Sequence, residues 1–311
     1  MNNQEKLKIV QAILTEEKRL GSANRVATKC GVSPATISQM KNKKWSLIRE
    51  EMWQKVASAL RVDFTSWNIA ENVYNTRFLM QIFEDAKREQ LFLAVSHKAG
   101  SGKTEAAQYY ATIKANHYVY YTQAREWAKR EFLLNACKNI GIEPERGTRS
   151  IDQLGQQVIG FFAERASQKP LWIIDEADKL KPSALRFLIT FYNQLEDKVG
   201  MVILGTENLR KEIERGVRLN KKGYDEIASR FGRNFVDLLG ATQEDVAKIC
   251  LVNGITDRKK HLEIFKEAKP VQVKISSAGQ TGFIRVVEDF RRIKRIIKRE
   301  LIKSQQKTAV L

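Results

Sequence analysis

The sequence predicts an α/β protein: a parallel sheet with helices on both faces, preceded by an all-α domain and followed by a helical lid. Five short apolar segments alternate with helical patterns between residues 91 and 240, and strands that alternate with helices form parallel sheets. Residues 1–70 and 241–311 show helical periodicity instead. We therefore expect an N-terminal domain at 1–70, a linker helix at 71–90, a core at 91–240 and a lid at 241–311.

The N-terminal domain contains the pattern of a helix-turn-helix in the stretch "NRVATKCGVSPATISQMKNKKW". Ala27 is a small residue that allows close helix packing, and Ile37 is a β-branched core residue ten positions later. Gly31 between them can adopt the left-handed conformation that ends a helix. Ser33 is a suitable cap for the next helix, and Pro34 suits its first position. The sequence therefore predicts two helices joined by a tight turn.

The second helix of this pair is the expected DNA-reading helix. Thr36 and Gln39 lie on its outward side, where such a helix reaches base edges in a major groove. Lys41, Lys43 and Lys44 follow and suit phosphate groups. Residues 1–70 hold twelve Lys and Arg against six Asp and Glu, which agrees with DNA binding. The alternative is an ordinary helical hairpin with an exposed basic end.

A helix around Tyr74–Glu89 is expected to connect this domain to the core, whose first strand, "LFLAVS", leads into "HKAGSGKTEAA". A glycine-rich loop between a strand and a helix is the setting of a phosphate-binding P-loop, or Walker A motif. Backbone N–H groups of Gly100, Ser101 and Gly102 would surround the phosphates of ATP, aided by the start of the helix. Lys103 would contact the β- and γ-phosphates, and Thr104 would bind Mg²⁺.

His97 occupies the position that usually holds the first glycine of the motif. A histidine is strained there only if the backbone requires a positive φ. We expect a turn residue with a solvent-facing ring, and the alternative is a phosphate contact.

The segment "LWIIDEADKL" supplies the partner motif, Walker B. Its apolar run reads as a buried central strand, so Asp175 lies at the carboxyl edge, where ligands bind in open α/β sheets. Asp175 is the second expected residue of the Mg²⁺ shell. Glu176 is expected to polarise the attacking water. The two motifs, in this order and on these elements, predict binding of ATP with Mg²⁺.

Three later positions complete the expected site. Thr206 follows the strand "MVILGT" and is the first candidate to orient the lytic water, with Asn208 as the second. Arg230, in "ASRFGRNF" with Arg233, precedes the fifth expected strand, "NFVDLL", and could act on the γ-phosphate of a neighbouring subunit. The alternative is packing at the surface. Arg285, in "QTGFIRVVEDF", is expected on a helix of the lid, in contact with the nucleotide.

The amino-acid composition indicates which kinds of partner and which kinds of site the protein can have. The 311 residues include 54 Lys and Arg against 36 Asp and Glu, which gives a net charge of +18. Such a charge favours a polyanionic partner, most often nucleic acid, over a merely soluble basic surface. The three cysteines are far apart in the sequence, which suggests neither a zinc site nor a disulfide framework. We expect buried reduced thiols in a cytoplasmic protein. No run approaches the roughly 18 apolar residues of a membrane span.

Together these motifs resemble those of AAA+ ATPases: "GSGKTEAA", "IIDEAD", a strand ending in "LGT", "SRF" and "GFIR". With the N-terminal helix-turn-helix, the chain resembles the phage Mu transposition protein B family over nearly its whole length. That resemblance implies ATP-dependent helical filaments on double-stranded target DNA, with little sequence preference, in a bacterial host. It further implies delivery of this DNA to a DDE transposase, which stimulates hydrolysis and disassembly. In such a protein Arg146 and Arg149, in the loop "GIEPERGTRS", would contact DNA.

Two other functions remain open from the residues. A transcription regulator could use the helix-turn-helix to read an operator, with the ATPase as a signalling module. A replication-initiator or helicase-loader ATPase would share the same motifs. The basic last stretch, "RVVEDFRRIKRIIKRELIKSQQK", is either a contact for DNA or transposase, or a solvated lid helix.

Overall fold

The computed structural model describes residues 1, 3–62, 67–113, 118–143, 150–277 and 280–309. Its centre is a parallel four-stranded sheet in the order β1-β4-β3-β2. The α/β fold class with a parallel sheet is therefore confirmed. The strands are β1 (Phe92–Ser96), β2 (Val119–Gln123), β3 (Leu171–Asp175) and β4 (Gly200–Gly205).

Alternate residues of the strands face two separate cores, because successive side chains in a strand point to opposite faces. One core packs α5 and α6 against residues such as Val95, Ile173 and Val202. The other packs the remaining helices of the core against residues such as Ala94 and Ile174. The helices are α5 (Tyr74–Glu89), α6 (Lys103–Ile113), α7 (Lys129–Asn139), α8 (Ile151–Ala163), α9 (Pro182–Leu195), α10 (Glu207–Arg218) and α11 (Tyr224–Arg230), with short 3₁₀ turns η3 (Ala166–Gln168) and η4 (Ala177–Lys179).

The fifth expected strand is reduced to a single bridge between Val95 and Val236. Val236 N donates to Ala94 O at 3.0 Å. The N–H groups that follow are directed to side chains instead of to a strand. Leu238 N donates to Nδ1 of His97, and Leu239 N donates to Oδ1 of Asn75. Pairing therefore stops after one residue, and the prediction of a full strand is wrong.

The N-terminal domain has the predicted helix-turn-helix. α2 ends at Gly31, whose φ is 64°, and the Ser33 hydroxyl caps α3 by accepting from Thr36 N at 3.2 Å. Ile37 and Met40 are buried against α2 and Trp53. The elements are α1 (Asn3–Leu20), α2 (Ala23–Cys30), α3 (Pro34–Lys41), η1 (Trp45–Leu47) and α4 (Glu50–Leu60).

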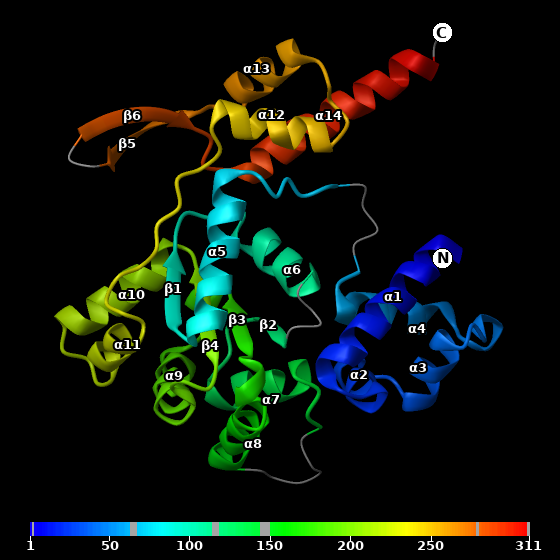
Figure 1. Ribbon diagram of the computed structural model, residues 1–311, viewed down its shortest axis with the longest axis vertical. Coiled ribbons are helices and arrows are strands. Elements are labelled where there is room, and N and C mark those ends of the chain that lie inside the picture. Colours follow the sequence, from blue (N-terminus) through cyan, green and yellow to red (C-terminus); the bar gives the residue numbers. More distant parts are fainter. Residues whose placement is uncertain (2, 63–66, 114–117, 144–149, 278–279, 310–311) are drawn as a thin grey trace.

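The N-terminal domain packs against the β2 edge of the sheet, beside α7 (Figure 1). Arg19 donates from Nη1 to the carbonyl of Val119 at 2.6 Å, and its guanidinium lies over the ring of Tyr120. Arg25 similarly lies over the ring of Phe161 on α8. The apolar residues of the domain are continuous with one of the two cores of the sheet, so the two parts share a hydrophobic interior.

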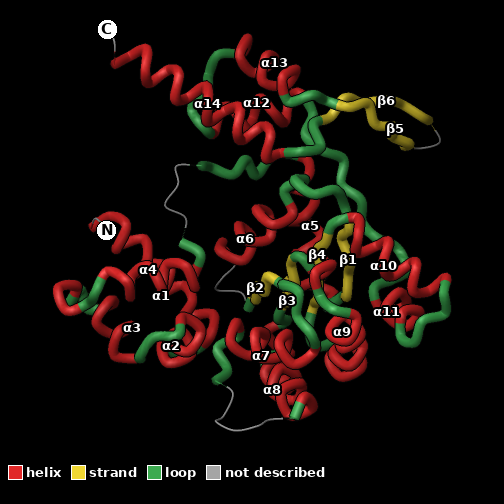
Figure 2. Tube along the Cα trace, turned by 180° about the vertical axis from the view of Figure 1, so that it is seen from behind, coloured by secondary structure: helices red, strands yellow, loops and turns green. Residues whose placement is uncertain are grey.

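The lid is not entirely helical, which corrects the prediction. It contains α12 (Gln243–Val252), α13 (Arg258–Glu267), β5 (Val271–Ser277), β6 (Gln280–Val286) and α14 (Phe290–Ala309). β5 and β6 form an antiparallel hairpin that projects from the lid, as Figure 2 shows in yellow. Val271, Val273 and Ile275 alternate with polar residues, which is the period of a strand and not of a helix.

Within the described ranges, no helix combines the length and the apolar composition that crossing a membrane requires. All three cysteines, Cys30, Cys137 and Cys250, are buried.

Candidate nucleotide site

The phosphate-binding loop lies between β1 and α6, as predicted. Gly100 and Gly102 have φ values of 85° and 89°, which only glycine adopts without strain. A Cβ on Gly100 would also lie 2.3 Å from Oδ1 of Asp289. The backbone therefore requires glycine at both positions, and a loop of this form directs N–H groups toward an anion.

Lys103 is the first residue of α6, and its side chain folds back over the loop. Its Nζ donates to the carbonyls of His97 and Lys98 at 2.7 and 3.0 Å, and to Oγ of Ser101 at 3.0 Å. Burial lowers the pKa of Lys103 to about 8. A bound phosphate would replace these neutral acceptors with a negative charge, which suits a partly desolvated ammonium.

Asp175 and Thr104 come together at the end of β3, as expected for a Mg²⁺ pair. A hydrogen bond from the Thr104 side chain is among the causes that lower the pKa of the Asp175 carboxyl. Oδ1 of Asp175 accepts from Glu176 N at 2.9 Å, and Oδ2 accepts from the hydroxyl of Tyr121 at 2.7 Å. Burial is the main cause that raises the pKa of Asp175, and the hydrogen bonds oppose it.

One carboxylate and one hydroxyl form a donor set that fits Mg²⁺, which keeps several waters and shares the phosphates of its nucleotide. The described residues contain no group of three or more His, Cys, Asp or Glu side chains that could hold a metal by themselves. The fit therefore favours a metal that binds with a nucleotide over a protein-only metal centre.

Glu176 has a backbone φ of 55°, which is an uncommon conformation for a residue other than glycine. Its Oε2 accepts from Nε2 of Gln123 at 3.0 Å and forms an ion pair with Nζ of Lys179 at 2.8 Å. These two contacts direct the carboxylate that was predicted to polarise water. Gln123 was missed by the sequence analysis, although a polar residue at the carboxyl end of β2 pairs in register with Asp175.

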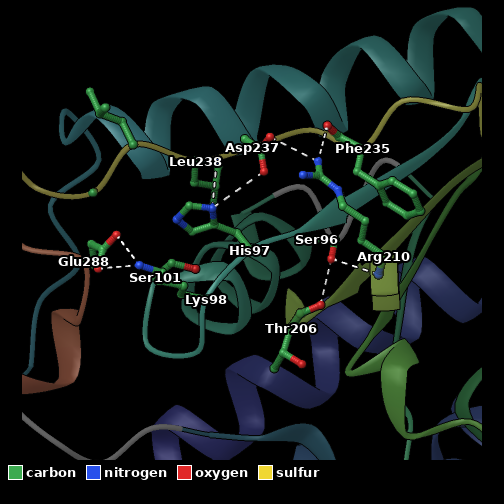
Figure 3. Close-up of polar contacts among 12 residues, drawn as sticks. Ser96, His97, Lys98, Ser101, Thr206, Arg210, Phe235, Asp237, Leu238 and Glu288 are labelled. Atoms are coloured by element: carbon green, nitrogen blue, oxygen red, sulfur yellow. Dashed lines mark hydrogen bonds and ion pairs between the residues drawn. The ribbon is translucent and has the colours of Figure 1, made fainter. Parts of the chain in front are cut away.

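Thr206 lies at the end of β4, but its hydroxyl is already engaged. It donates to Oδ2 of Asp178 at 2.7 Å and accepts from Asn208 N, which caps α10. Ser96 of the neighbouring strand holds the Thr206 carbonyl at 2.7 Å (Figure 3). Asn208, the second candidate, is exposed at the start of the same helix. A role for Thr206 in orienting water remains a prediction that requires release from Asp178.

The ring of His97 is not solvent-facing, which corrects the prediction. Its side chain is only 14% exposed, and Nδ1 accepts a hydrogen bond from Leu238 N at 3.3 Å (Figure 3). Burial, followed by the charge of Lys103, lowers the pKa of His97, so the ring is neutral beside Asp237. The backbone of His97 is not among those with positive φ, which explains why this position does not require glycine.

Asn75 connects three segments around the loop and was not predicted from the sequence. It is fully buried on α5, and its Nδ2 donates to Ser101 O at 3.1 Å. Its Oδ1 accepts from the N–H groups of Leu239 and Gly240, both at 3.1 Å. One amide side chain thus links the linker helix, the phosphate-binding loop and the segment that leads to the lid.

The start of α14 closes on the phosphate-binding loop. Phe290 N donates to Gly100 O at 2.8 Å, and Glu288 forms an ion pair with Lys98 at 2.8 Å. The charge of Arg291, in the first turn of α14, is among the causes that lower the pKa of Lys103. Arg291 is therefore a lid arginine within electrostatic range of the loop.

Arg285, the predicted lid arginine, lies on strand β6 opposite Gln272 and is exposed. The expected position on a helix is wrong, because the strand pattern of the hairpin extends to Val286. No hydrogen bond or ion pair joins Arg285 to the described residues of the phosphate-binding loop. Its contact with a nucleotide stays a prediction.

Arg230 ends α11 and contacts α9. Its guanidinium donates to Oδ1 of Asn193 at 3.2 Å and lies over the ring of Tyr192. Arg233 instead pairs with Asp225 at 2.9 Å. Arg230 is thus engaged with α9 and Arg233 with α11. A role for Arg230 at a neighbouring site remains a prediction.

The predicted DNA-binding residues differ in availability. The Thr36 hydroxyl hydrogen-bonds to that of Ser33 at 2.9 Å, and Lys41 forms an ion pair with Glu17. Gln39 is partly exposed, and Lys43 and Lys44 are exposed. Arg146 and Arg149 lie outside the described residues.

Residues 86–213 match the sequence model of a family described as an AAA domain. This chain contains an AAA domain. The matched segment includes the phosphate-binding loop, Asp175, Glu176 and Thr206. The AAA domain implies binding of ATP, typically with Mg²⁺, and ATPase activity. No curated protein sequence matches the chain.

A solved structure of Cdc6p from Pyrobaculum aerophilum is similar in fold, with a TM-score of 0.54 at 14% sequence identity. The match covers 79% of this chain and 67% of that chain. It therefore extends beyond the AAA domain, and at this identity it establishes a likeness of fold alone.

Proposed function

We propose that this protein is an ATP-dependent DNA-binding ATPase that assembles on double-stranded target DNA and delivers it to a DDE transposase. The observation that supports this best is the position of the helix-turn-helix. It shares a hydrophobic interior with the AAA domain, and Lys43 and Lys44 after α3 are exposed. A DNA-binding unit packed in this way can couple nucleotide state to DNA affinity through the shared interior.

In this proposal the residues of the site bind and hold ATP. The loop and Lys103 hold the phosphates, while Thr104 and Asp175 hold Mg²⁺, which neutralises phosphate charge when it is bound. Glu176 orients water once Gln123 and Lys179 release or share its carboxylate. Hydrolysis would then end the assembled state, as a switch and not as the source of a product.

The test is DNA binding measured with ATP, with a non-hydrolysable analogue and without nucleotide, by filter retention and by electron microscopy. We expect extended coating of DNA only in the two nucleotide-bound states. Equal binding in all three conditions would exclude the ATP-dependent switch.

Glu176→Gln separates binding from hydrolysis in the same assay. We expect ATP binding to persist, hydrolysis to fall by about 10²–10⁴-fold, and the DNA-bound assembly to last longer. Hydrolysis at the wild-type rate would remove Glu176 from its assigned role. Lys103→Ala is the matched control, because it should lose both nucleotide and DNA coating.

A replication-initiator or helicase-loader ATPase is the second candidate. The fold likeness to Cdc6p covers 79% of the chain, and so includes helical regions on both sides of the AAA domain. Affinity purification with ATP distinguishes the two. Recovery of a DDE transposase supports the first proposal, and recovery of a replicative helicase supports the second.

A further inference from the structure

A cation of the N-terminal domain lies beside the Mg²⁺ site. Arg61 follows α4, with a left-handed φ of 54°. Its guanidinium lies over the ring of Tyr121 on β2, with 4.2 Å between the guanidinium carbon and the ring centroid. A guanidinium within about 6 Å of an aromatic face is attracted to it. Arg61 and Tyr121 therefore form a direct contact between the two domains.

Tyr121 carries this contact to the Walker B carboxylate. Tyr121 is only 8% exposed, and its hydroxyl donates to Oδ2 of Asp175 at 2.7 Å. The Asp175 carboxylate is then fixed at both oxygens, since Oδ1 accepts from Glu176 N at 2.9 Å. Gln108 of α6 also reaches the Tyr121 hydroxyl, at 3.4 Å. The orientation of the metal-binding carboxylate thus depends on Tyr121 together with the backbone N–H of Glu176.

The charge of Arg61 also acts on the site through space. Burial lowers the pKa of Arg61, and the negative charges of Asp175 and Glu176 are among the causes that oppose this shift. The N-terminal domain therefore contributes a positive charge to the surroundings of the Walker B carboxylates, which belong to the AAA domain.

Arg61 makes this contact at the margin of an open cleft of about 470 Å³ between α4 and α6. Gln54, Ser58 and Gln108 line the cleft with it. The domains are held together elsewhere, by the shared hydrophobic interior and by the bond from Arg19 to Val119. Replacing Arg61 removes a contact across a cleft and leaves the packed interface intact.

We propose that Arg61 and Tyr121 are positioning residues for Asp175, through which the N-terminal domain sets the affinity of the AAA domain for Mg²⁺–ATP. Residues that hold a metal ligand in place commonly change metal affinity by about 10–100-fold when they are replaced. The inference rests on the Mg²⁺–ATP site and requires neither DNA binding nor a transposase.

The experiment measures the equilibrium affinity of the full chain for a fluorescent ATP analogue, with Mg²⁺ and with EDTA. The ratio of the two affinities reports how well the metal is held, independently of hydrolysis. We expect Tyr121→Phe, which keeps the ring, and Arg61→Ala each to lower this ratio by about ten-fold. The double variant should lower it no further than the more affected single variant, because both residues act through the same carboxylate.

Arg49→Ala is the control, since this exposed arginine precedes the same helix and makes no capping contact through its side chain. Its ratio should equal that of the wild type. Thermal unfolding of each variant identifies a loss of folding, which lowers both affinities and leaves their ratio unchanged. An unchanged ratio in folded Tyr121→Phe, or additive effects in the double variant, overturns the inference.

The outcomes also separate this inference from the proposed function. Wild-type protein that binds Mg²⁺–ATP but not DNA contradicts the proposed function and leaves the inference standing. Variants with unchanged ratios and normal DNA coating contradict the inference alone. Wild-type protein with equal affinity in Mg²⁺ and EDTA contradicts both.

Discussion

At the scale of single residues, the nucleotide site is held by side chains that already satisfy one another. Lys103 donates to its own loop, Asp175 accepts from Tyr121, and Glu176 accepts from Gln123 and Lys179. The contacts of Lys103 have to be exchanged, and those of Glu176 shared, when ATP and Mg²⁺ bind, whereas the hydrogen bond from Tyr121 holds Asp175 in position. The side chains of the site are therefore already in place, and the affinity for ATP depends on how easily Lys103 gives up its contacts within the loop.

The lowered pKa of Lys103 predicts how ATP affinity depends on pH. Burial sets this pKa to about 8 in the free protein, and bound phosphate favours the charged ammonium. Above that pH, binding must take up a proton. We therefore expect ATP affinity to fall as pH rises above 8, where Lys103 is deprotonated in the free protein.

Calorimetric titrations of ATP at several pH values, in two buffers of different ionisation enthalpy, measure both the affinity and the proton uptake. An affinity that stays constant up to pH 9.5 would contradict a lowered pKa at Lys103. Lys103→Ala, which is expected not to bind ATP, gives the baseline heat of these titrations.

At the scale of elements, most of the secondary structure could be predicted wherever the residues that determine an element lie within that element. The helix-turn-helix follows from Gly31 and Ser33, and the phosphate-binding loop follows from Gly100 and Gly102, because these residues act locally. The fifth strand could not be predicted as a bridge, since its N–H groups are diverted to Asn75 and His97, which are distant in sequence.

The hairpin in the lid was missed for a different reason: its alternation is short and lies between two strong helical patterns. The roles of Gln123, Asn75 and Tyr121 were missed because each depends on a partner from another element. The sequence therefore identifies the motif residues but not the residues that orient them.

Replacing each of two glycines of α8 with alanine is expected to change the free energy of unfolding in opposite directions. Gly160 has no atom within 4 Å of where a Cβ would lie, whereas a Cβ on Gly155 would lie 2.7 Å from the ring of Phe187. Gly160→Ala should raise the free energy of unfolding by about 0.5–1 kcal/mol, because alanine favours a helix over glycine. Gly155→Ala should lower it by about 1 kcal/mol, because overpacking exceeds that gain.

Chemical denaturation of the two variants beside the wild type checks this pair. Stabilisation of both variants would show that helix propensity, and not packing against Phe187, decides the stability of α8. Neither glycine contacts the nucleotide site, so ATP affinity should be unchanged in both.

At the scale of the whole molecule, the helix-turn-helix, the AAA domain and the lid meet around one site. Arg61 reaches it from the N-terminal domain, and Phe290 and Glu288 reach it from the lid. The net charge of +18 favours a polyanion over the exposed surface. Both observations support an ATPase whose nucleotide state and DNA affinity are linked.

Salt dependence tests the DNA contact of the N-terminal domain. Each lysine that neutralises a phosphate contributes about 0.9 to the slope of log affinity against log salt concentration. Replacing Lys43 and Lys44 together with alanine should reduce this slope by about 2. Lys41→Ala is the matched control, because its ammonium is already paired with Glu17, and should leave the slope nearly unchanged. Identical slopes for all three proteins would place the DNA elsewhere.

The role expected for Arg230 predicts that one molecule completes the nucleotide site of another. Arg230→Ala and Glu176→Gln should each bind ATP and hydrolyse it poorly. A mixture of the two should recover part of the activity, because the Glu176→Gln protein supplies Arg230 to a neighbour that retains Glu176. Steady-state ATPase rates at varied mixing ratios measure this, and a rate that never exceeds the sum of the separate variants would assign Arg230 to packing against Tyr192 alone.

The position of the N-terminal domain has a consequence for handling the protein. β2 is the last strand in the order of the sheet, and Arg19 binds the carbonyl of Val119 at that margin. An uncovered strand of this kind offers N–H and C=O groups to other chains and promotes aggregation. Removing residues 1–62 to isolate the ATPase would uncover it, together with the apolar surface beneath α1 and α2. We therefore expect the domain that is proposed to bind DNA also to limit self-association of the rest of the chain.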